Sequence, residues 1–114
     1  MLRTCYALCS LLAVATLMVG TAVTGSGEEV PASVAIRESG FEPTTLEVKV
    51  GVKFELIVEN ATSKAAEFES SELNREKVVP AGSTVRINIG PLAPGSYPYV
   101  DDFNKAHRGA IAAK

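Results

Sequence analysis

Sulfur-containing residues and tryptophan are scarce in this chain of 114 residues, and their scarcity excludes several kinds of chemistry. The two cysteines are Cys5 and Cys9, the two methionines are Met1 and Met18, and tryptophan is absent. Downstream of Met18 the chain therefore has no thiolate to bind a metal or attack a substrate, and no disulfide. Because His107 is the only histidine, a metal site in this part of the chain must use mainly oxygen ligands.

The N-terminal segment has the composition of a secretory signal peptide. A short basic start, "MLR", precedes the uncharged apolar run "CYALCSLLAVATLMVGTAV", and small residues follow in "GTAVTGSG". This order is typical of a signal peptide. We therefore expect residues 1–27 to be removed and residues 28–114 to form one exported, periplasmic domain. An uncleaved membrane anchor is the alternative, because the apolar run is nearly long enough to span a bilayer.

The expected domain carries little net charge. The whole chain has a formal net charge of −2, and loss of Arg3 with the signal peptide changes it to about −3. A weakly acidic domain is not typical of nucleic-acid-binding proteins, so we expect no nucleic-acid partner. Without cysteine, it also has no disulfide-linked partner.

About seven short segments alternate apolar and polar side chains with the period of a β-strand, and turn residues separate them. They cover residues 32–38, 45–50, 53–60, 66–70, 84–89, 96–102 and 108–113. This spacing predicts an all-β, antiparallel Greek-key β-sandwich. A short helical turn is expected in the polar loop "SSELNRE", with Ser71 as its cap. Pro98 is expected to place its strand at a sheet edge or to make it irregular.

A block of carboxylates stands out in the stretch "AEFESSELNREKVV". It holds four glutamates within ten residues, namely Glu67, Glu69, Glu72 and Glu76. With Phe68 in the core, Glu67 and Glu69 would share the outer face of one strand. The block is therefore either a solvated loop or a site for a hard metal ion.

Several motifs between residues 41 and 111 resemble the cupredoxin fold family. They are "FEPTTLEVKVG", "FELIVEN", "EFESSELNREKVVPAGS", "IGPLAPGSYPYVDDFN" and "RGAI". Together they most resemble the cupredoxin-like domains of bacterial periplasmic iron-uptake systems, the EfeO-type and Ftr-type proteins. The resemblance implies a bound iron or copper ion. It also implies a membrane iron permease or a periplasmic iron-binding protein as partner, and at most an assisting role in Fe(II) oxidation.

The resemblance also shows which residues stand where blue-copper cupredoxins carry their ligands. Ala66 takes the place of the first histidine and Asp101 that of the cysteine. Asn104 lies near the place of the second histidine, and His107 near that of the methionine. Because a type 1 site needs a copper–thiolate bond, we expect a cupredoxin-like protein without a blue-copper site.

The donors that remain suit Fe(II), Fe(III), Mn(II) or Cu(II). Crowded carboxylates repel one another at neutral pH, and a cation relieves that repulsion. The family fold would bring the strand that begins at Ala66 and the end of "YPYVDDFN" to the same pole. The candidate metal ligands are Glu67, Glu69, Glu76, Asp101, Asp102 and His107.

Other interpretations stay open. The protein could be a β-sandwich interaction module that has lost metal binding, since a fold does not dictate a function. In that case Glu72 would pair with Arg75, or Glu76 with Lys77, and the two aspartates would form a turn. Basic residues could then dock an acidic partner, namely Arg75, Lys77, Lys105 and Arg108. An enzyme acting alone has the least support, because no Ser–His–Asp arrangement, cysteine nucleophile or phosphate loop is recognisable.

Overall fold

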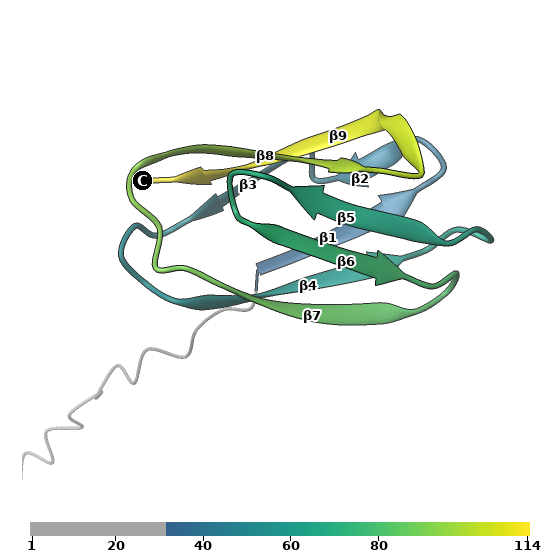
Figure 1. Cartoon of the computed structure of the whole chain (residues 1–114), viewed down its shortest axis with the longest axis horizontal. Helices are drawn as coiled ribbons and strands as arrows, with labels where there is room; N and C mark the ends of the chain where they lie inside the picture. The colour runs from purple at the N-terminus through teal and green to yellow at the C-terminus, as the bar shows by residue number, and fades with distance from the viewer. Residues whose placement is uncertain (1–31) are drawn as a thin grey trace, which may run out of the picture.

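A computed structural model describes residues 32–114, which form nine β-strands and no helix (Figure 1). The strands are β1 (Ala32–Arg37), β2 (Gly40–Glu42), β3 (Thr45–Val48), β4 (Phe54–Asn60), β5 (Ala66–Ser70), β6 (Arg75–Val79), β7 (Thr84–Ile89), β8 (Gly95–Asp101) and β9 (Asn104–Ala113). The described residues contain no helix that could span a membrane. The expected signal peptide, residues 1–27, lies outside this range.

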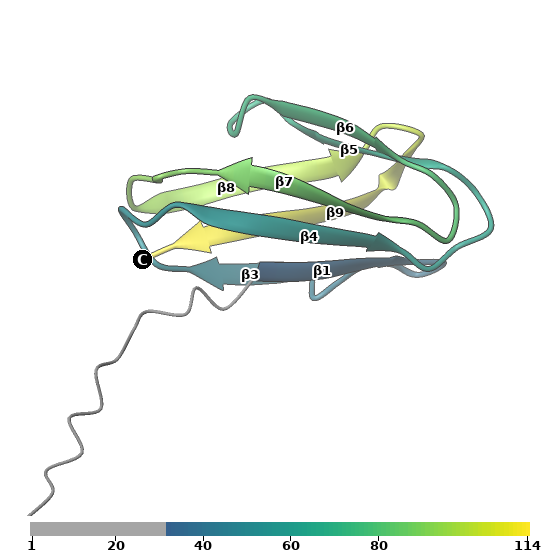
Figure 2. The same cartoon turned by 90° about the horizontal axis from the view of Figure 1, so that it is seen from below.

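The strands form two sheets, which confirms the predicted all-β sandwich. One sheet has the order β2-β1-β4-β7 and the other the order β3-β9-β8-β5-β6. Figure 1 shows the β8–β9 hairpin on one side of the molecule and β4 and β7 on the other, and Figure 2 shows β6 at an outer edge. The pairing is not wholly antiparallel, because β1 pairs with β4, and β3 with β9, in parallel.

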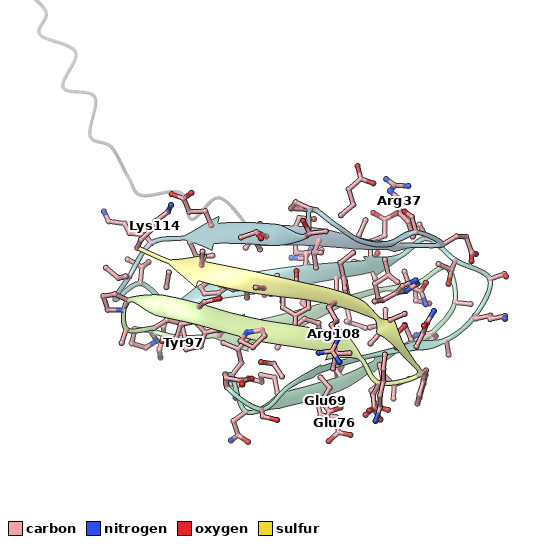
Figure 3. The ribbon with its side chains drawn as sticks, turned by 90° about the horizontal axis from the view of Figure 1, so that it is seen from above. Arg37, Glu69, Glu76, Tyr97, Arg108 and Lys114 are labelled. Carbon is pink, nitrogen blue, oxygen red and sulfur yellow. The ribbon has the colours of Figure 1, made fainter. Side chains whose placement is uncertain are left out.

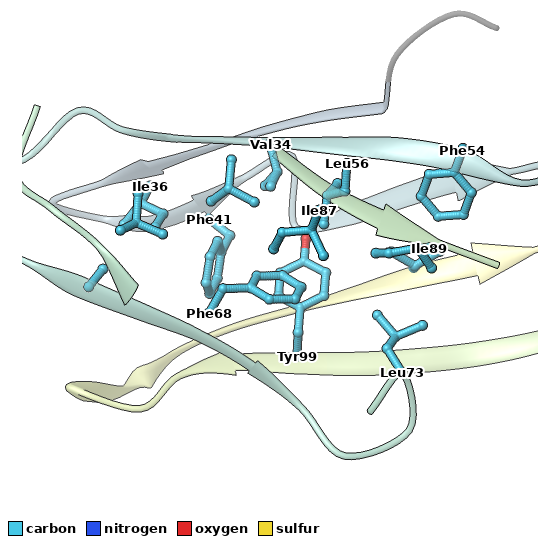
Figure 4. Close-up of a cluster of buried hydrophobic side chains, with 14 residues drawn as sticks. Val34, Ile36, Phe41, Phe54, Leu56, Phe68, Leu73, Ile87, Ile89 and Tyr99 are labelled. Atoms are coloured by element: carbon cyan, nitrogen blue, oxygen red, sulfur yellow. The ribbon is translucent and has the colours of Figure 1, made fainter. Parts of the chain in front are cut away.

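Alternating apolar side chains from both sheets meet in one core (Figure 4). Phe68 on β5 is fully buried, and its ring lies 4.9 Å from that of Tyr99 on β8, centroid to centroid. Phe41 meets Tyr99 edge to face at 4.8 Å. Gly109 on β9 lies opposite Tyr99, and a Cβ there would come within 2.5 Å of the tyrosine ring. The ring therefore occupies the space that a side chain at Gly109 would need.

The turn expected after β5 forms at residues 71–74, but it does not extend into a helix, because the chain returns at Arg75 as strand β6. The Ser70 hydroxyl accepts the Leu73 N–H, and Asn74 takes a left-handed backbone with a φ of 52°. Asn tolerates this conformation better than most residues. Leu73 is buried at this point, which holds the turn against the core and lets β6 pair with β5.

Strand β8 lies inside its sheet, so Pro98 does not mark an edge. The pairing of β8 with β5 is nevertheless irregular, because it covers Asp101 and Val100 and stops before Pro98. The Ser70 hydroxyl donates to the Pro98 carbonyl oxygen at 2.7 Å. The Ser70 side chain thus supplies a hydrogen bond between β5 and β8 where the backbone pairing has stopped.

Asn60, at the end of β4, organises the loop that leads to β5. Its side chain is fully buried and its Nδ2 donates to the carbonyl oxygens of Lys64 (2.7 Å) and Val79 (3.0 Å). Its Oδ1 accepts bonds from the backbone N–H and the hydroxyl of Thr62. These four bonds fix the approach of the chain to Ala66, where β5 begins.

Candidate functional site

Four carboxylates lie together on the outer face of the five-stranded sheet. Glu67 and Glu69 project from β5, Glu76 from β6 and Asp102 from the turn between β8 and β9. We call these four residues the acidic face. Since Phe68 is fully buried, the outward direction expected for its two neighbours follows from strand alternation. Figure 3 shows Glu69 and Glu76 side by side on one side of the molecule.

The side chains of the acidic face are joined two by two. Glu67 lies close enough to Glu76, and Glu69 to Asp102, for a carboxyl–carboxyl hydrogen bond to form when one group of the pair is protonated. A hydrogen bond between two carboxyl groups requires that one of them keeps its proton. Such a bond favours the protonated form of Glu67 and of Glu69, because two charges at these positions would repel.

These contacts raise the pKa of both glutamates on β5. The hydrogen bond to Glu76 contributes most to raising the pKa of Glu67 from its ordinary value of 4.5 to about 7, and burial and neighbouring charges add to it. The hydrogen bond to Asp102, and then its charge, raise the pKa of Glu69, while Lys105 partly opposes the shift. The acidic face thus holds protons at pH values where an isolated carboxyl group would have lost them.

The acidic face is not a ready-made metal site. Within residues 32–114, no group of three or more Asp, Glu, His or Cys side chains stands in an arrangement that could hold a metal ion. The register nevertheless places Glu69 directly opposite Glu76, and the Glu67 carbonyl oxygen accepts the Asp102 N–H at 2.9 Å. The four carboxylates of the acidic face therefore lie on neighbouring backbone segments. Their side chains must rotate before they can bind one cation together.

Asp101 lies apart from the acidic face, although it was a candidate ligand. It pairs with buried Phe68 in the sheet and is only 4% exposed. Its Oδ1 accepts the N–H of Glu67 at 2.9 Å and that of Phe103 at 3.0 Å. The carboxylate therefore closes the turn at the end of β8, which is the alternative that aspartates in turns suggest.

His107 also lies apart from the acidic face, at a cavity of about 150 Å³ at the pole of the sandwich. All four residues at the blue-copper positions line this cavity, namely Ala66, Asp101, Asn104 and His107. The imidazole Nε2 is 3.4 Å from the Asn104 amide nitrogen. Its Nδ1 is buried with no hydrogen-bond partner among the described residues. The structure thus divides the predicted ligands between the acidic face and this cavity, which Asp101 and His107 line.

The basic residues near the acidic face have mostly structural contacts. Arg75 donates from Nε to the Asn88 carbonyl oxygen on β7 (3.0 Å) and from a terminal nitrogen to the Asn74 carbonyl oxygen (2.9 Å). Lys105 lies 3.6 Å from Asp102. The ion pairs found in residues 32–114 include neither Glu72 with Arg75 nor Glu76 with Lys77. The Arg75 contact across the two sheets was not predictable from the sequence pattern.

The comparison with protein families is decisive for the fold. The sequence profile of the cupredoxin-like domain matches residues 8–113. The chain belongs to the cupredoxin-like domain family. Protein RP394 of Rickettsia prowazekii (strain Madrid E), itself described as uncharacterized, is 38% identical over 72 residues. That match covers 63% of this chain and 58% of the relative, so the chain spans less than two thirds of the relative's length.

Solved structures with the same fold include copper proteins. The metal-binding domain of the Cu(I)-exporting ATPase CopA from Streptococcus pneumoniae D39 has a TM-score of 0.66 at 16% identity, covering 74% of this chain and 84% of that one. Auracyanin A, a blue copper protein from Chloroflexus aurantiacus, has a TM-score of 0.66 at 14% identity, covering 75% and 98%. At such identities the likeness shows the fold alone, and this fold is one that metal-binding domains use.

Proposed function

We propose that this cupredoxin-like protein is exported to the periplasm and binds an iron or copper ion on its acidic face, as part of iron uptake. It would pass iron as cargo to a membrane permease or to another periplasmic iron-binding protein, as the resemblance to EfeO-type and Ftr-type domains implies. The signal-peptide-like composition of residues 1–27 supports export. Sequencing the N-terminus of the protein recovered from the periplasm tests this part.

The observation that carries the proposal is the pairing of the four carboxyl groups. The fold holds Glu67 near Glu76, and Glu69 near Asp102, and this crowding raises the pKa of both glutamates on β5. A cation that replaces protons on these groups leaves four anionic oxygen donors on one surface. Hard ions such as Fe(III) favour that donor set, and Cu(II) also accepts oxygen ligands.

The residues that line the cavity beside His107, at the pole of the sandwich, do not fit a blue-copper centre. Residues 32–114 contain no cysteine, and a type 1 site requires one. Asp101 holds the position of that ligand, but its Oδ1 is already engaged by two backbone N–H groups. We therefore propose no electron-carrier role for this chain and no independent oxidation of Fe(II).

The proposal is tested by the thermal midpoint of the purified protein with and without Fe(III), supplied as its nitrilotriacetate complex, or Cu(II). A ligand at about 100 times its Kd raises the midpoint of a domain of this size by about 10–20 °C. We expect Glu67→Gln with Glu69→Gln to abolish the rise. The control, Glu47→Gln with Glu59→Gln, removes the same charge elsewhere and should retain it. Equal rises in both double variants would disprove the site.

One observation favours a second function, an interaction module without a metal. No three donors among the described residues stand in a metal-holding arrangement, so the acidic face could serve to contact a basic protein surface. This alternative predicts that neither ion changes the thermal midpoint of the wild-type protein, because a ligand must bind the native state to stabilise it.

A further inference from the structure

One buried carboxylate ties together the two segments that carry the acidic face. Asp101 ends β8, and Glu67 follows the first residue of β5, 34 residues earlier in the chain. The Asp101 Oδ1 accepts the Glu67 N–H at 2.9 Å, and the next residue, Asp102, donates its N–H to the Glu67 carbonyl oxygen at 2.9 Å. Both backbone groups of Glu67 are therefore held by the turn at the end of β8.

The side chain of Asp101 takes the place of a missing ladder bond. In an antiparallel ladder, every second pair of opposed residues exchanges two backbone hydrogen bonds. Glu67 and Asp102 exchange only one such bond, from Asp102 to Glu67, because the Glu67 N–H turns to the Asp101 carboxylate instead. The same oxygen also accepts the Phe103 N–H at 3.0 Å, which closes the turn. One oxygen atom thus links the turn after β8 to the start of β5.

This register determines which carboxyl groups meet. The pairing of β5 with β8 covers only Phe68 opposite Asp101 and Glu69 opposite Val100. The bonds made through Asp101 and Asp102 extend this short contact to Glu67. They are the hydrogen bonds that carry the contact between β5 and β8 beyond Asp101 to Asp102, which lies beside Glu69. Asp101 therefore helps to hold Asp102 next to Glu69 on the acidic face.

We propose that Asp101 is a positioning residue for the acidic face and not one of its metal ligands. The inference rests on the proposed function for the metal, but its structural part stands on the hydrogen bonds alone. Each carboxylate oxygen offers two acceptor sites; both sites of Oδ1 are occupied by backbone N–H groups, so only Oδ2 is left for a ligand. Asp101 also lies on the inner side of the sheet with Phe68, opposite to the acidic face.

The conservative variant Asp101→Asn separates the two roles. An asparagine keeps one carbonyl oxygen for the Glu67 and Phe103 N–H groups but lacks the negative charge that a hard metal ligand supplies. Asp101→Ala removes the acceptor and leaves both N–H groups without it. We measure Fe(III) and Cu(II) affinity of the purified full chain, and the amide hydrogen exchange of Glu67 and Phe103 in the metal-free protein.

We expect Asp101→Asn to bind metal as the wild type does, with both amides still protected. We expect Asp101→Ala to lose about tenfold or more in affinity, as removal of an outer-shell partner typically does, and to show at least about tenfold faster exchange at both amides. If Asp101→Ala does not fold, that failure itself shows that the acceptor is needed for the structure, and the asparagine variant decides whether Asp101 is a ligand.

Two results would overturn the inference. The first is an Asp101→Asn variant that loses metal affinity while both amides stay protected, which would make Asp101 a ligand. The second is an Asp101→Ala variant in which the Glu67 amide remains protected. If the wild type binds neither ion, the proposed function fails, and the exchange of the Glu67 amide in the two variants still tests the positioning role.

Discussion

Glu69 and Glu76 lie directly opposite each other on the antiparallel strands β5 and β6. Like charges at opposed positions destabilise a sheet, and this sheet adds Glu67 and Asp102 on the same surface. Protonation permits a carboxyl–carboxyl hydrogen bond and relieves this repulsion, which raises the pKa values of Glu67 and Glu69. The arrangement costs stability when no cation is bound. The stability of the protein should therefore depend both on pH and on added metal ion.

The first prediction concerns the pH dependence of stability. The pKa of Glu67 is about 7 in the folded protein and 4.5 for an unperturbed group. Between these values the folded state binds a proton that the unfolded state has released, so stability falls as the pH rises. We therefore expect the urea midpoint of the metal-free protein to decrease from about pH 5 to about pH 8.

Two matched variants show whether Glu67 causes this decrease of the urea midpoint with pH. Glu67→Gln should flatten it, because the amide cannot lose a proton and keeps the hydrogen bond to Glu76. Glu59→Gln, an exposed glutamate on the other sheet, should leave it unchanged. A wild-type midpoint that is flat or rises over this range would contradict the raised pKa of Glu67.

The second prediction concerns Asn60, whose side chain makes four hydrogen bonds while fully buried. Asn60→Ala leaves the carbonyl oxygens of Lys64 and Val79 without these donors and should cost about 2–4 kcal/mol of unfolding free energy. Thr62→Val removes only the hydroxyl and should cost about 1 kcal/mol. Chemical denaturation measures both, and equal losses would show that the Asn60 side chain is not the organiser of the loop.

The third prediction concerns Gly109 and Tyr99. A methyl group at residue 109 would overlap the tyrosine ring, with contacts of 2.5 to 2.7 Å. Gly109→Ala should therefore destabilise the protein by about 1–3 kcal/mol. In the background of Tyr99→Leu, which removes the ring, the same substitution should cost much less. A double-mutant cycle without coupling between the two positions would refute this packing.

The fourth prediction concerns Arg75, which joins β6 to the edge of β7 through the Asn88 carbonyl oxygen. Arg75→Gln shortens the side chain and should cost about 1 kcal/mol, with faster amide exchange along β6. Lys77→Gln, on the same strand and without an ion pair among those found in residues 32–114, should have little effect. Equal effects of the two substitutions would mean that Arg75 acts only through its charge.

The sandwich was predictable from the sequence because apolar alternation marks strands that have one face in the core. Phe68 is an example, since its burial fixes the outward direction of both neighbouring glutamates. Strand β6 was not predictable in this way, because of its five residues only Val79 is buried. Its strand conformation depends on pairing with β5 and on the tight turn before it, which are tertiary effects.

The candidate site was predictable only in part. Residue type and strand alternation suggested that Glu67 and Glu69 share a surface. They could not show that the Asp101 side chain points inward and that of Asp102 outward. The strand ends at these residues, and the geometry of the turn determines the direction of each side chain. The inward direction of Asp101 depends on the hydrogen bonds that its Oδ1 accepts from two backbone N–H groups. Neither donor can be recognised from the sequence.

The most direct test of the account is the number of protons released when the acidic face binds Cu(II), which stays in solution at mildly acidic pH. Glu67 has a pKa of about 7, so at about pH 6 the account predicts release of about one proton or more per ion by the wild type. It predicts almost none from the variant with Glu67→Gln and Glu69→Gln. Binding without proton release, or equal release by the two proteins, would contradict the claim that a cation replaces protons on these carboxyl groups.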